Sequence, residues 1–283
     1  MSDPTVRRRR LGAELRRLRD VAGLKIDEVV ERTTLNAPKV SRIETARIGV
    51  KVADLDTLLD LYAVDDAEKR DALHRLARDG RTRGWWQTYR DYISPAYADL
   101  ISLEADAKSM RSYETTLIPG LLQTAAYARA TIDAINMTTP RERVNALVEI
   151  RMARQSVLSR PQPLELWAIV HEAALRLDVP GPHVMRDQLQ RLLDLQDLPH
   201  VSIQALPLDA APHPGLSGAF AVIGFPETAD LDVVHVESLT SALYVEDPAE
   251  VSIYGSAFER LRAAALPFDK TADLIAQVKD SIT

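Results

Sequence analysis

Residues 36–49, with the sequence NAPKVSRIETARIG, constrain the fold of the N-terminal region more than any other stretch. Asn36 has the side chain of a helix N-cap and Pro38 is tolerated in a first turn, so the stretch predicts a short helix. Only Val40 and Ile43 are clearly apolar within it. A helix this short is not stable alone in water. It must therefore pack against other helices through these two side chains and leave its polar side to solvent.

The surrounding sequence predicts four more short helices. An apolar stripe with helical spacing runs from Leu11 to Ala22 and ends near Gly23. Three further stripes are formed by Ile26, Val29, Val30 and Thr33, then by Leu55, Leu58, Leu59 and Tyr62, then by Leu73 and Leu76 before Gly80. Five short helices within residues 1–80 predict a small all-α domain.

The second and third expected helices are joined by a tight turn, which predicts a helix-turn-helix. In such a unit the second helix has few core residues because its other side enters the major groove of DNA. We expect Lys39 and Arg42 to be its main cations, and the Arg7–Arg10 run to contact phosphates. The residues expected to contact DNA are Asn36, Ala37, Lys39, Ser41, Arg42, Arg47 and Lys51.

Charge is shared unevenly along the chain. Residues 1–51 hold 13 Lys or Arg against 7 Asp or Glu, although the whole chain of 283 residues has a net charge of −6. A basic N-terminal region attached to an acidic body indicates that the first meets a polyanion and the second does not. On charge alone, a merely solvated helix face is the alternative.

Composition excludes several classes of protein. No stretch approaches 18 consecutive apolar residues, so the sequence predicts no membrane span. Arg16, Arg17 and Arg19 interrupt the apolar run that a signal peptide would need. The chain has no Cys, which excludes disulfides, thiolate nucleophiles and Cys-ligated zinc. We therefore expect a cytoplasmic protein, and the dominance of Arg over Lys indicates a high-GC bacterial genome.

Residues 95–283 predict a different architecture, after a connector at 81–94 that contains two Trp. Strands and helices mix without strict alternation, which indicates an α+β domain with a mixed or antiparallel sheet. The expected strands are 101–105, 109–117, 164–170, 201–206, 219–225, 232–237 and 242–246. The expected helices are 123–135, 140–159, 183–195, 249–264 and 270–281.

The second domain carries no catalytic motif. His171 and Glu172 resemble the start of a zinc-protease helix, but Leu175 stands where H-E-x-x-H requires His. The sequence also contains no G-x-S-x-G, P-loop or dinucleotide fingerprint. We therefore expect no enzyme activity and no bound metal or cofactor.

Polar residues of this domain predict a binding site instead. Gly120 lies in an expected tight turn, and Arg151, Arg154 and Gln155 share one helix face. Glu172 follows an expected buried strand, where pairing with Arg154 would avoid an unpaired carboxylate. A buried ion pair without a ligand is the alternative. The expected ligand or partner residues are Gly120, Gln123, Arg151, Arg154, Gln155, Glu172 and His213, the last within a loop at 211–218.

The N-terminal residues resemble a known family. The run from Leu11 to Arg47 is similar to the helix-turn-helix of the phage-repressor and Cro-like (XRE) family, whose recognition helix ends in Ser-Arg-Ile-Glu, here residues 41–44. The resemblance implies that Arg19, four residues before Gly23, pairs with Glu44. A charged pair at the edge of a small core would fix the angle between the first and third helices.

The second domain also resembles a family, the C-terminal domain of actinobacterial regulators that include WhiJ-like and antitoxin-like proteins. The motifs that carry the resemblance are LIPGLLQTAAYARA, RMARQSVL, HEAALR, QLQRLL and HPGLSGAF, in this order. Genes of that family often neighbour one for a small partner protein, so the resemblance implies such a partner. It implies no chemistry for the domain.

Together these features predict a sequence-specific DNA-binding transcriptional regulator with a C-terminal effector- or partner-binding domain. We expect a homodimer, because one recognition helix reads few base pairs and two helices about 34 Å apart would read a near-palindromic operator. The alternative is an antitoxin-like interaction protein that binds a small partner protein and autoregulates its operon.

Overall fold

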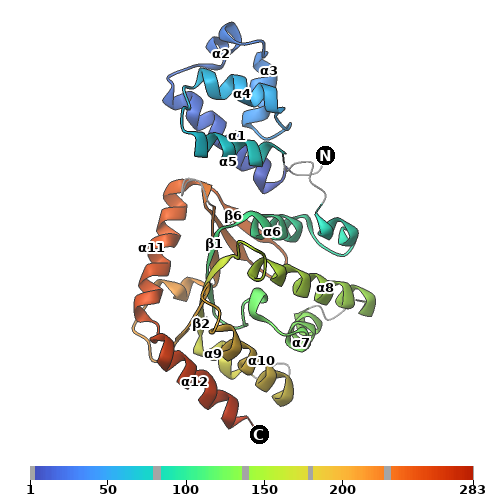
Figure 1. Ribbon diagram of the computed structural model, residues 1–283, viewed down its shortest axis with the longest axis vertical. Helices are drawn as coiled ribbons and strands as arrows, with labels where there is room; N and C mark the ends of the chain where they lie inside the picture. The colour runs from blue at the N-terminus through green and yellow to red at the C-terminus, as the bar shows by residue number, and fades with distance from the viewer. Residues whose placement is uncertain (1–3, 79–83, 136–139, 178–180, 226–230, 283) are drawn as a thin grey trace. The chain divides into compact units, whose positions relative to one another are not determined.

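The computed structural model describes residues 4–78, 84–135, 140–177, 181–225 and 231–282. The described residues form two compact units: the first contains the described residues up to Trp85 together with Leu231, and the second contains the others. The first unit is helical and the second contains a sheet (Figure 1). The expected boundary at residue 80 lies outside the described residues.

The first unit has the five short helices that the sequence predicts. They are α1 (Val6–Val21), α2 (Ile26–Arg32), α3 (Ala37–Glu44), α4 (Val52–Leu61) and α5 (Ala67–Arg78). The apolar stripes become one shared core, in which Leu15, Leu55 and Leu73 are fully buried. The all-α architecture of this unit is confirmed.

Local sequence signals fix the ends of α1 and α3. The Oδ1 atom of Asn36 accepts a hydrogen bond from the Lys39 N–H at 2.9 Å and so caps α3 as expected. Gly23 follows α1 with a φ of 70°, a left-handed conformation that favours glycine at the end of a helix. The turn that follows leads directly into α2.

A glycine contact sets how closely α1 and α3 approach. A Cβ atom built on Gly12 would lie 2.6 Å from the carbonyl oxygen of Ile43 and 2.8 Å from that of Glu44. Backbone atoms cannot move away as a flexible side chain could. Only glycine therefore allows α1 to pass this close to the C-terminal end of α3.

The second unit is built on a six-stranded sheet with the order β3-β2-β1-β4-β5-β6. The strands are β1 (Ser109–Glu114), β2 (Glu165–His171), β3 (Val201–Leu206), β4 (Phe220–Gly224), β5 (Val233–Glu237) and β6 (Ala242–Val245). β1, β2 and β3 are parallel, whereas β4, β5 and β6 run antiparallel to their neighbours. The sheet is therefore mixed, and the expected α+β fold is confirmed.

Helices cover both faces of this sheet (Figure 1). The α-helices are α6 (Pro95–Asp106), α7 (Ala125–Ile135), α8 (Arg141–Arg154), α9 (Glu172–Arg176), α10 (Pro182–Leu195), α11 (Pro248–Ala264) and α12 (Phe268–Ser281). The 3-10 turns are η1 (Trp85–Tyr89), η2 (Gly120–Leu122), η3 (Gln155–Leu158) and η4 (Pro214–Ser217). α11 and α12 lie on one side and α6, α7 and α8 on the other.

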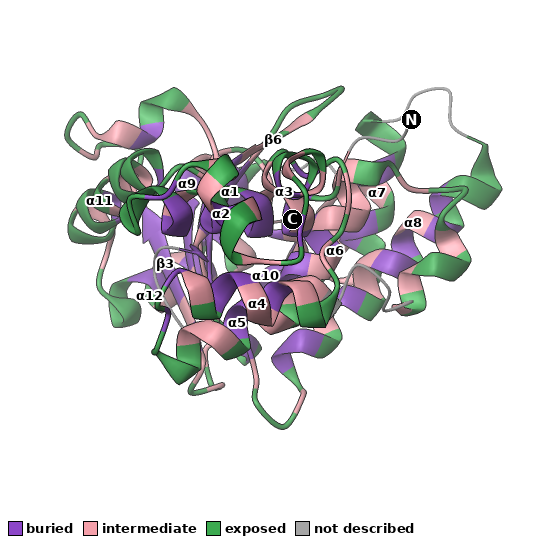
Figure 2. Ribbon diagram, turned by 90° about the horizontal axis from the view of Figure 1, so that it is seen from above, coloured by how far each residue is buried: buried purple, intermediate pink, exposed green. Residues whose placement is uncertain are grey.

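One hydrophobic core of the second unit lies between the sheet and α11. Tyr113, Phe220 and Phe258 are among its buried side chains, and most of the sheet is coloured as buried in Figure 2. None of the described helices is both long and apolar enough to cross a membrane.

One expected strand is wrong, because residues 101–105 lie inside α6. The Oγ atom of Ser94 accepts a hydrogen bond from the Tyr97 N–H at 3.1 Å and caps a helix that begins at Pro95. The buried residues of this helix are Leu100, Ile101, Leu103 and Glu104. From the sequence, Ile101 and Leu103 fit strand alternation, but with Leu100 they form one helix face. The other expected strands and helices are present, with ends that differ by a few residues.

Candidate functional site

The helix α3 has the two sides that the sequence predicts. Val40 and Ile43 are buried in the core, whereas Asn36, Ser41 and Arg42 are exposed. Ala37 is half-buried at the first turn. The side chain of Asn36 uses its oxygen for the cap, which leaves its amide N–H groups available to an acceptor. The exposed side of α3 is therefore polar and carries hydrogen-bond donors.

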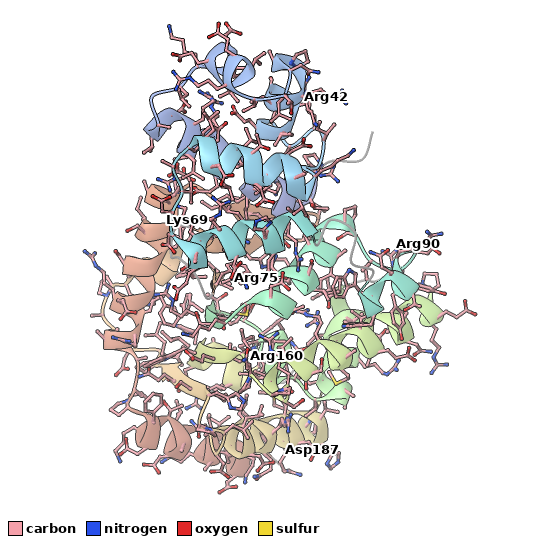
Figure 3. The ribbon with its side chains drawn as sticks, turned by 45° about the horizontal axis from the view of Figure 1, so that its top comes forward. Arg42, Lys69, Arg75, Arg90, Arg160 and Asp187 are labelled. Carbon is pink, nitrogen blue, oxygen red and sulfur yellow. The ribbon has the colours of Figure 1, made fainter. Side chains whose placement is uncertain are left out.

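Three of the expected DNA contacts are exposed cations. Arg42 lies at the surface of the helical unit (Figure 3), and Arg47 and Lys51 lie on the segment that follows α3. Within the part of the chain that the structure describes, none of these three side chains forms a hydrogen bond or an ion pair. They can therefore meet a phosphate or a base edge without first losing a partner.

Lys39 lies on the same helix as Arg42, but its ammonium group already has an ion-pair partner. Its Nζ atom lies 2.8 Å from the Oδ2 atom of Asp54, in the first turn of α4. On sequence alone Lys39 and Arg42 are equivalent cations, and the structure separates them. Asp54 is the residue that sequence reasoning missed, although an acidic residue in the first turn of a helix is a common signal.

Arg19 and Glu44 lie in contact and connect α1 to the end of α3. The Nε and Nη2 atoms of Arg19 donate hydrogen bonds to the two carboxylate oxygens of Glu44 at 2.7 and 3.0 Å. The Glu44 carboxylate raises the pKa of Arg19. Arg19 also donates to the carbonyl oxygen of Leu24 at 2.8 Å. This bidentate ion pair joins α1 to the end of α3 and so helps to set the angle between these two helices.

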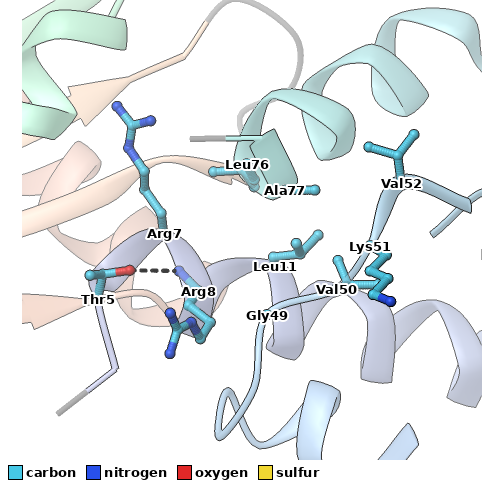
Figure 4. Close-up of a pocket in the computed structure, with 10 residues that line it drawn as sticks. All are labelled: Thr5, Arg7, Arg8, Leu11, Gly49, Val50, Lys51, Val52, Leu76 and Ala77. Carbon is cyan, nitrogen blue, oxygen red and sulfur yellow. Dashed lines mark hydrogen bonds between the residues drawn. The ribbon is translucent and has the colours of Figure 1, made fainter. Parts of the chain in front are cut away.

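The helical unit also contains a cleft of about 710 Å³ (Figure 4). Its lining is largely apolar with a basic edge, and the residues are Thr5, Arg7, Arg8, Leu11, Gly49, Val50, Lys51, Val52, Leu76 and Ala77. Arg7 and Arg10 are buried, while Arg8 and Arg9 are half-buried. The Arg7–Arg10 run is therefore less exposed than its expected role in contacting phosphates would suggest.

In the second unit, the structure brings four of the seven expected ligand residues into one hydrogen-bonded cluster. Nη1 of Arg151 donates to the Gln123 side-chain oxygen at 3.0 Å. Nε2 of Gln155 donates to the Gln123 backbone oxygen at 2.7 Å and to that of Gly120 at 3.4 Å. The cluster joins η2, which follows β1, to the end of α8.

Arg154 does not pair with Glu172 as expected. Its Nε and Nη2 atoms donate to the carboxylate of Glu104 at 2.8 and 2.5 Å, and its Nη1 atom donates to the Tyr97 hydroxyl at 2.8 Å. Glu172 instead accepts from Nε of Arg176 at 2.7 Å and from the Leu208 N–H at 3.0 Å. The reason is that 101–105 is helical, which places Glu104 against α8.

His213 lies apart from this cluster. Its ring packs edge-on against Tyr113, with centroids 6.2 Å apart, and its Nδ1 atom is buried without a hydrogen-bond partner. Burial and the nearby His213 lower the pKa of His171.

The seven expected ligand residues do not form a single site, because Glu172 and His213 are not part of the hydrogen-bonded cluster around Arg151. Among the described residues, no group of three or more His, Asp or Glu could hold a metal ion.

Comparison with known proteins finds two families that match parts of the chain. Residues 97–277 match a family described as a domain of unknown function (DUF5753). The chain belongs to this DUF5753 family. Residues 10–73 match a helix-turn-helix domain, which supports DNA binding by the first unit of this DUF5753 protein. No curated protein and no solved structure matches the chain.

Proposed function

We propose that this DUF5753 protein is a sequence-specific transcriptional regulator of the XRE type that binds DNA through α3. The observation that carries the proposal is the unpaired, exposed Arg42 on a helix whose other side is anchored by Val40 and Ile43. An arginine in this position can donate two hydrogen bonds to the major-groove edge of a guanine. Lys51 and Arg47 lie just beyond the helix and suit the phosphates on either side.

The regulator acts as a homodimer in this proposal. The exposed part of α3 spans only a few residues, and one such helix reads too few base pairs to select a single operator. Two copies bound about 34 Å apart on a near-palindrome would double the contacts. The second unit, which is much the larger, supplies the contact between copies.

Selection of binding sites from a random duplex library tests this function. The full-length protein should enrich a near-palindrome whose half-sites are separated by one helical turn. The Arg42→Ala variant should enrich this sequence poorly, or should lose the preference at one of its base pairs. Enrichment of no sequence, with a protein that binds all duplexes alike, would overturn sequence-specific recognition. Light scattering of the protein on the selected duplex would show whether two copies are bound.

The second unit binds an effector or a partner rather than DNA in this proposal. Residues 85–283 carry a net charge of −10, which repels a phosphate backbone and favours a basic or neutral partner. The same negative charge also fits the alternative function, an antitoxin-like protein that holds a small partner protein and autoregulates its operon. Under either function, we propose that the protein is actinobacterial and cytoplasmic. Purification from the native host separates the two functions, because only the alternative requires a stoichiometric small protein.

A further inference from the structure

The cleft of the helical unit is lined by three segments that lie far apart in the sequence. They are the start of α1, the segment that links α3 to α4 with the first residue of α4, and the end of α5. The Leu11 side chain points toward Leu76 and Ala77 of α5 (Figure 4). The volume of about 710 Å³ lies within the range of pockets that hold small molecules.

The apolar part of this lining is accessible to water. The side chain of Val52 is 44% exposed, and Val50, Leu76 and Ala77 are half-buried. A Cβ atom built on Gly49 would meet no atom within 4 Å, so the lining is open at this residue too. Removing exposed apolar surface from water favours binding of an apolar group. The cleft therefore offers an apolar wall that a ligand can reach.

The edge of the cleft is basic. Arg8 is half-buried and Lys51 is exposed, and within the described part of the chain neither side chain forms a hydrogen bond or an ion pair. Arg7 also lines the cleft, but it is buried. None of the described residues that line the cleft is Asp or Glu. Charges of one sign along a cleft attract a ligand of the opposite sign, so this edge favours an anionic group.

We propose that the cleft binds a small amphipathic carboxylate, with its acid group at Arg8 and Lys51 and its apolar chain on Leu11, Val52 and Leu76. The carboxylate would accept charge-assisted hydrogen bonds from the two cations, and the chain would cover the apolar wall. A short anion would leave this wall in contact with water. An amphiphile with a cationic head would be repelled by the basic edge.

Such a ligand would compete with DNA, a consequence that rests on the proposed contact between Lys51 and a phosphate. An ammonium group that pairs with the ligand carboxylate is no longer available to the DNA backbone. Because coupling between two ligands is reciprocal, DNA should weaken binding of the carboxylate by the same factor. The helical unit would then respond to a small molecule by itself, without a signal from the second unit.

Calorimetric titration of the full-length protein with decanoate, below the concentration at which decanoate forms micelles, tests the site. We expect saturable binding of one decanoate per chain. Octanoate should bind roughly tenfold more weakly, because each of its two missing methylene groups contributes about three- to fourfold. Acetate, which lacks the chain, and decyltrimethylammonium, which has the opposite charge, should each bind at least about tenfold more weakly than decanoate.

Two pairs of variants locate the ligand. Arg8→Gln combined with Lys51→Gln should weaken decanoate binding at least about tenfold. Arg16→Gln combined with Arg32→Gln removes the same charge from exposed positions outside the lining and should change the affinity little. Val52→Asp places a carboxylate on the apolar wall and should also weaken binding at least about tenfold. Val21→Asp is its control, because Val21 is 74% exposed and lies outside the lining.

Absence of saturable decanoate binding would overturn the proposal. So would equal affinity for octanoate and decanoate, or binding that Val52→Asp and the Arg8 and Lys51 double variant leave unchanged. Self-association of the protein that Val52→Asp abolishes would instead assign the cleft to a second copy of the chain.

Fluorescence anisotropy with a random-sequence duplex tests the competition. Saturating decanoate should weaken duplex binding and reduce the slope of log affinity against log salt concentration by about 0.9, the value for one lost phosphate contact. An unchanged slope would overturn the competition at Lys51. The titrations contain no DNA, so their failure leaves the DNA-binding proposal intact, whereas a protein that binds decanoate but no duplex would overturn DNA binding alone.

Discussion

The ammonium group of Lys39 on α3 lies 2.8 Å from the carboxylate of Asp54 on α4. Both side chains are partly shielded, with 34% and 17% of their surfaces exposed. The helix α3 is thus tied to the next helix by one of its own cations. If α3 meets DNA as we propose, a phosphate that binds Lys39 must compete with a carboxylate that is already in place, and we therefore expect Asp54 to limit the affinity for DNA.

Asp54→Asn should strengthen binding to any duplex, because it releases Lys39 to pair with a phosphate. The slope of log affinity against log salt concentration should steepen by about 0.9, the value for one added phosphate contact. Fluorescence anisotropy over a salt series measures both quantities. Asp65→Asn is the control, since it removes the same charge from an exposed position of the helical unit. Equal effects of the two substitutions would show that Asp54 acts only through net charge.

Arg42→Ala should cost about 1–3 kcal/mol of binding free energy at the operator and relax the preference at one base pair. Arg47→Ala should instead weaken all sequences alike and reduce the salt slope by about 0.9. Both residues are exposed arginines, so each serves as the control for the other. If Arg42→Ala weakens operator and random DNA equally, Arg42 contacts a phosphate and the base-reading assignment is wrong.

Glu44→Arg should destabilise the helical unit by about 3 kcal/mol, because it places two guanidinium groups together at a buried position. The double substitution with Arg19→Glu should recover part of this loss. Recovery is incomplete because the carboxylate introduced by Arg19→Glu would face the Leu24 carbonyl and the side chain of Asp20. Urea unfolding of the four proteins gives the coupling energy. Additive losses would mean that the two residues do not interact.

Gly12→Ala should lower the free energy of unfolding by about 1–3 kcal/mol, because the new methyl group would overlap the backbone of α3. Gly49→Ala is the matched control, since a Cβ at that position meets nothing within 4 Å. Thermal unfolding compares the two. Similar melting temperatures for both variants would show that α1 and α3 can separate at little cost.

Glu114 should make the second unit less stable as pH rises. Burial and the nearby Glu237 raise its pKa to about 8 in the folded state, so between about pH 4.5 and pH 8 the unfolded chain loses this proton while the folded chain keeps it. Glu114→Gln should therefore raise the melting temperature more at pH 8 than at pH 5.5. The difference between variant and parent cancels the other titrating groups, including His235. An equal shift at both pH values would contradict the raised pKa.

The helical unit could be predicted almost completely from the sequence because each of its signals is local. The Asn36 cap and the Gly23 stop act within one turn, and the apolar stripes fix which side of each helix is buried. The Arg19 to Glu44 contact could be proposed only through the family resemblance. The ion pair of Lys39 with Asp54 depends on how α4 packs against α3, which no local pattern encodes.

The polar cluster of the second unit was predicted in part. Spacing along α8 placed Arg151 and Gln155 on one face, and the structure brings both to η2. Spacing could not identify the partner of Arg154, because Glu104 was assigned to a strand and lies fifty residues away.

The central place of β1 has a consequence for synthesis on the ribosome. β1 pairs with β2 through a parallel ladder, but its other edge is covered only by β4, which leaves the ribosome after β2 and β3. A nascent chain that ends after β3 therefore exposes the hydrogen-bonding edge of its central strand. Such edges pair readily with other chains, so translational pausing in this interval favours aggregation. Proteins truncated before Phe220 should accumulate in inclusion bodies, whereas chains that extend through β6 have this edge covered.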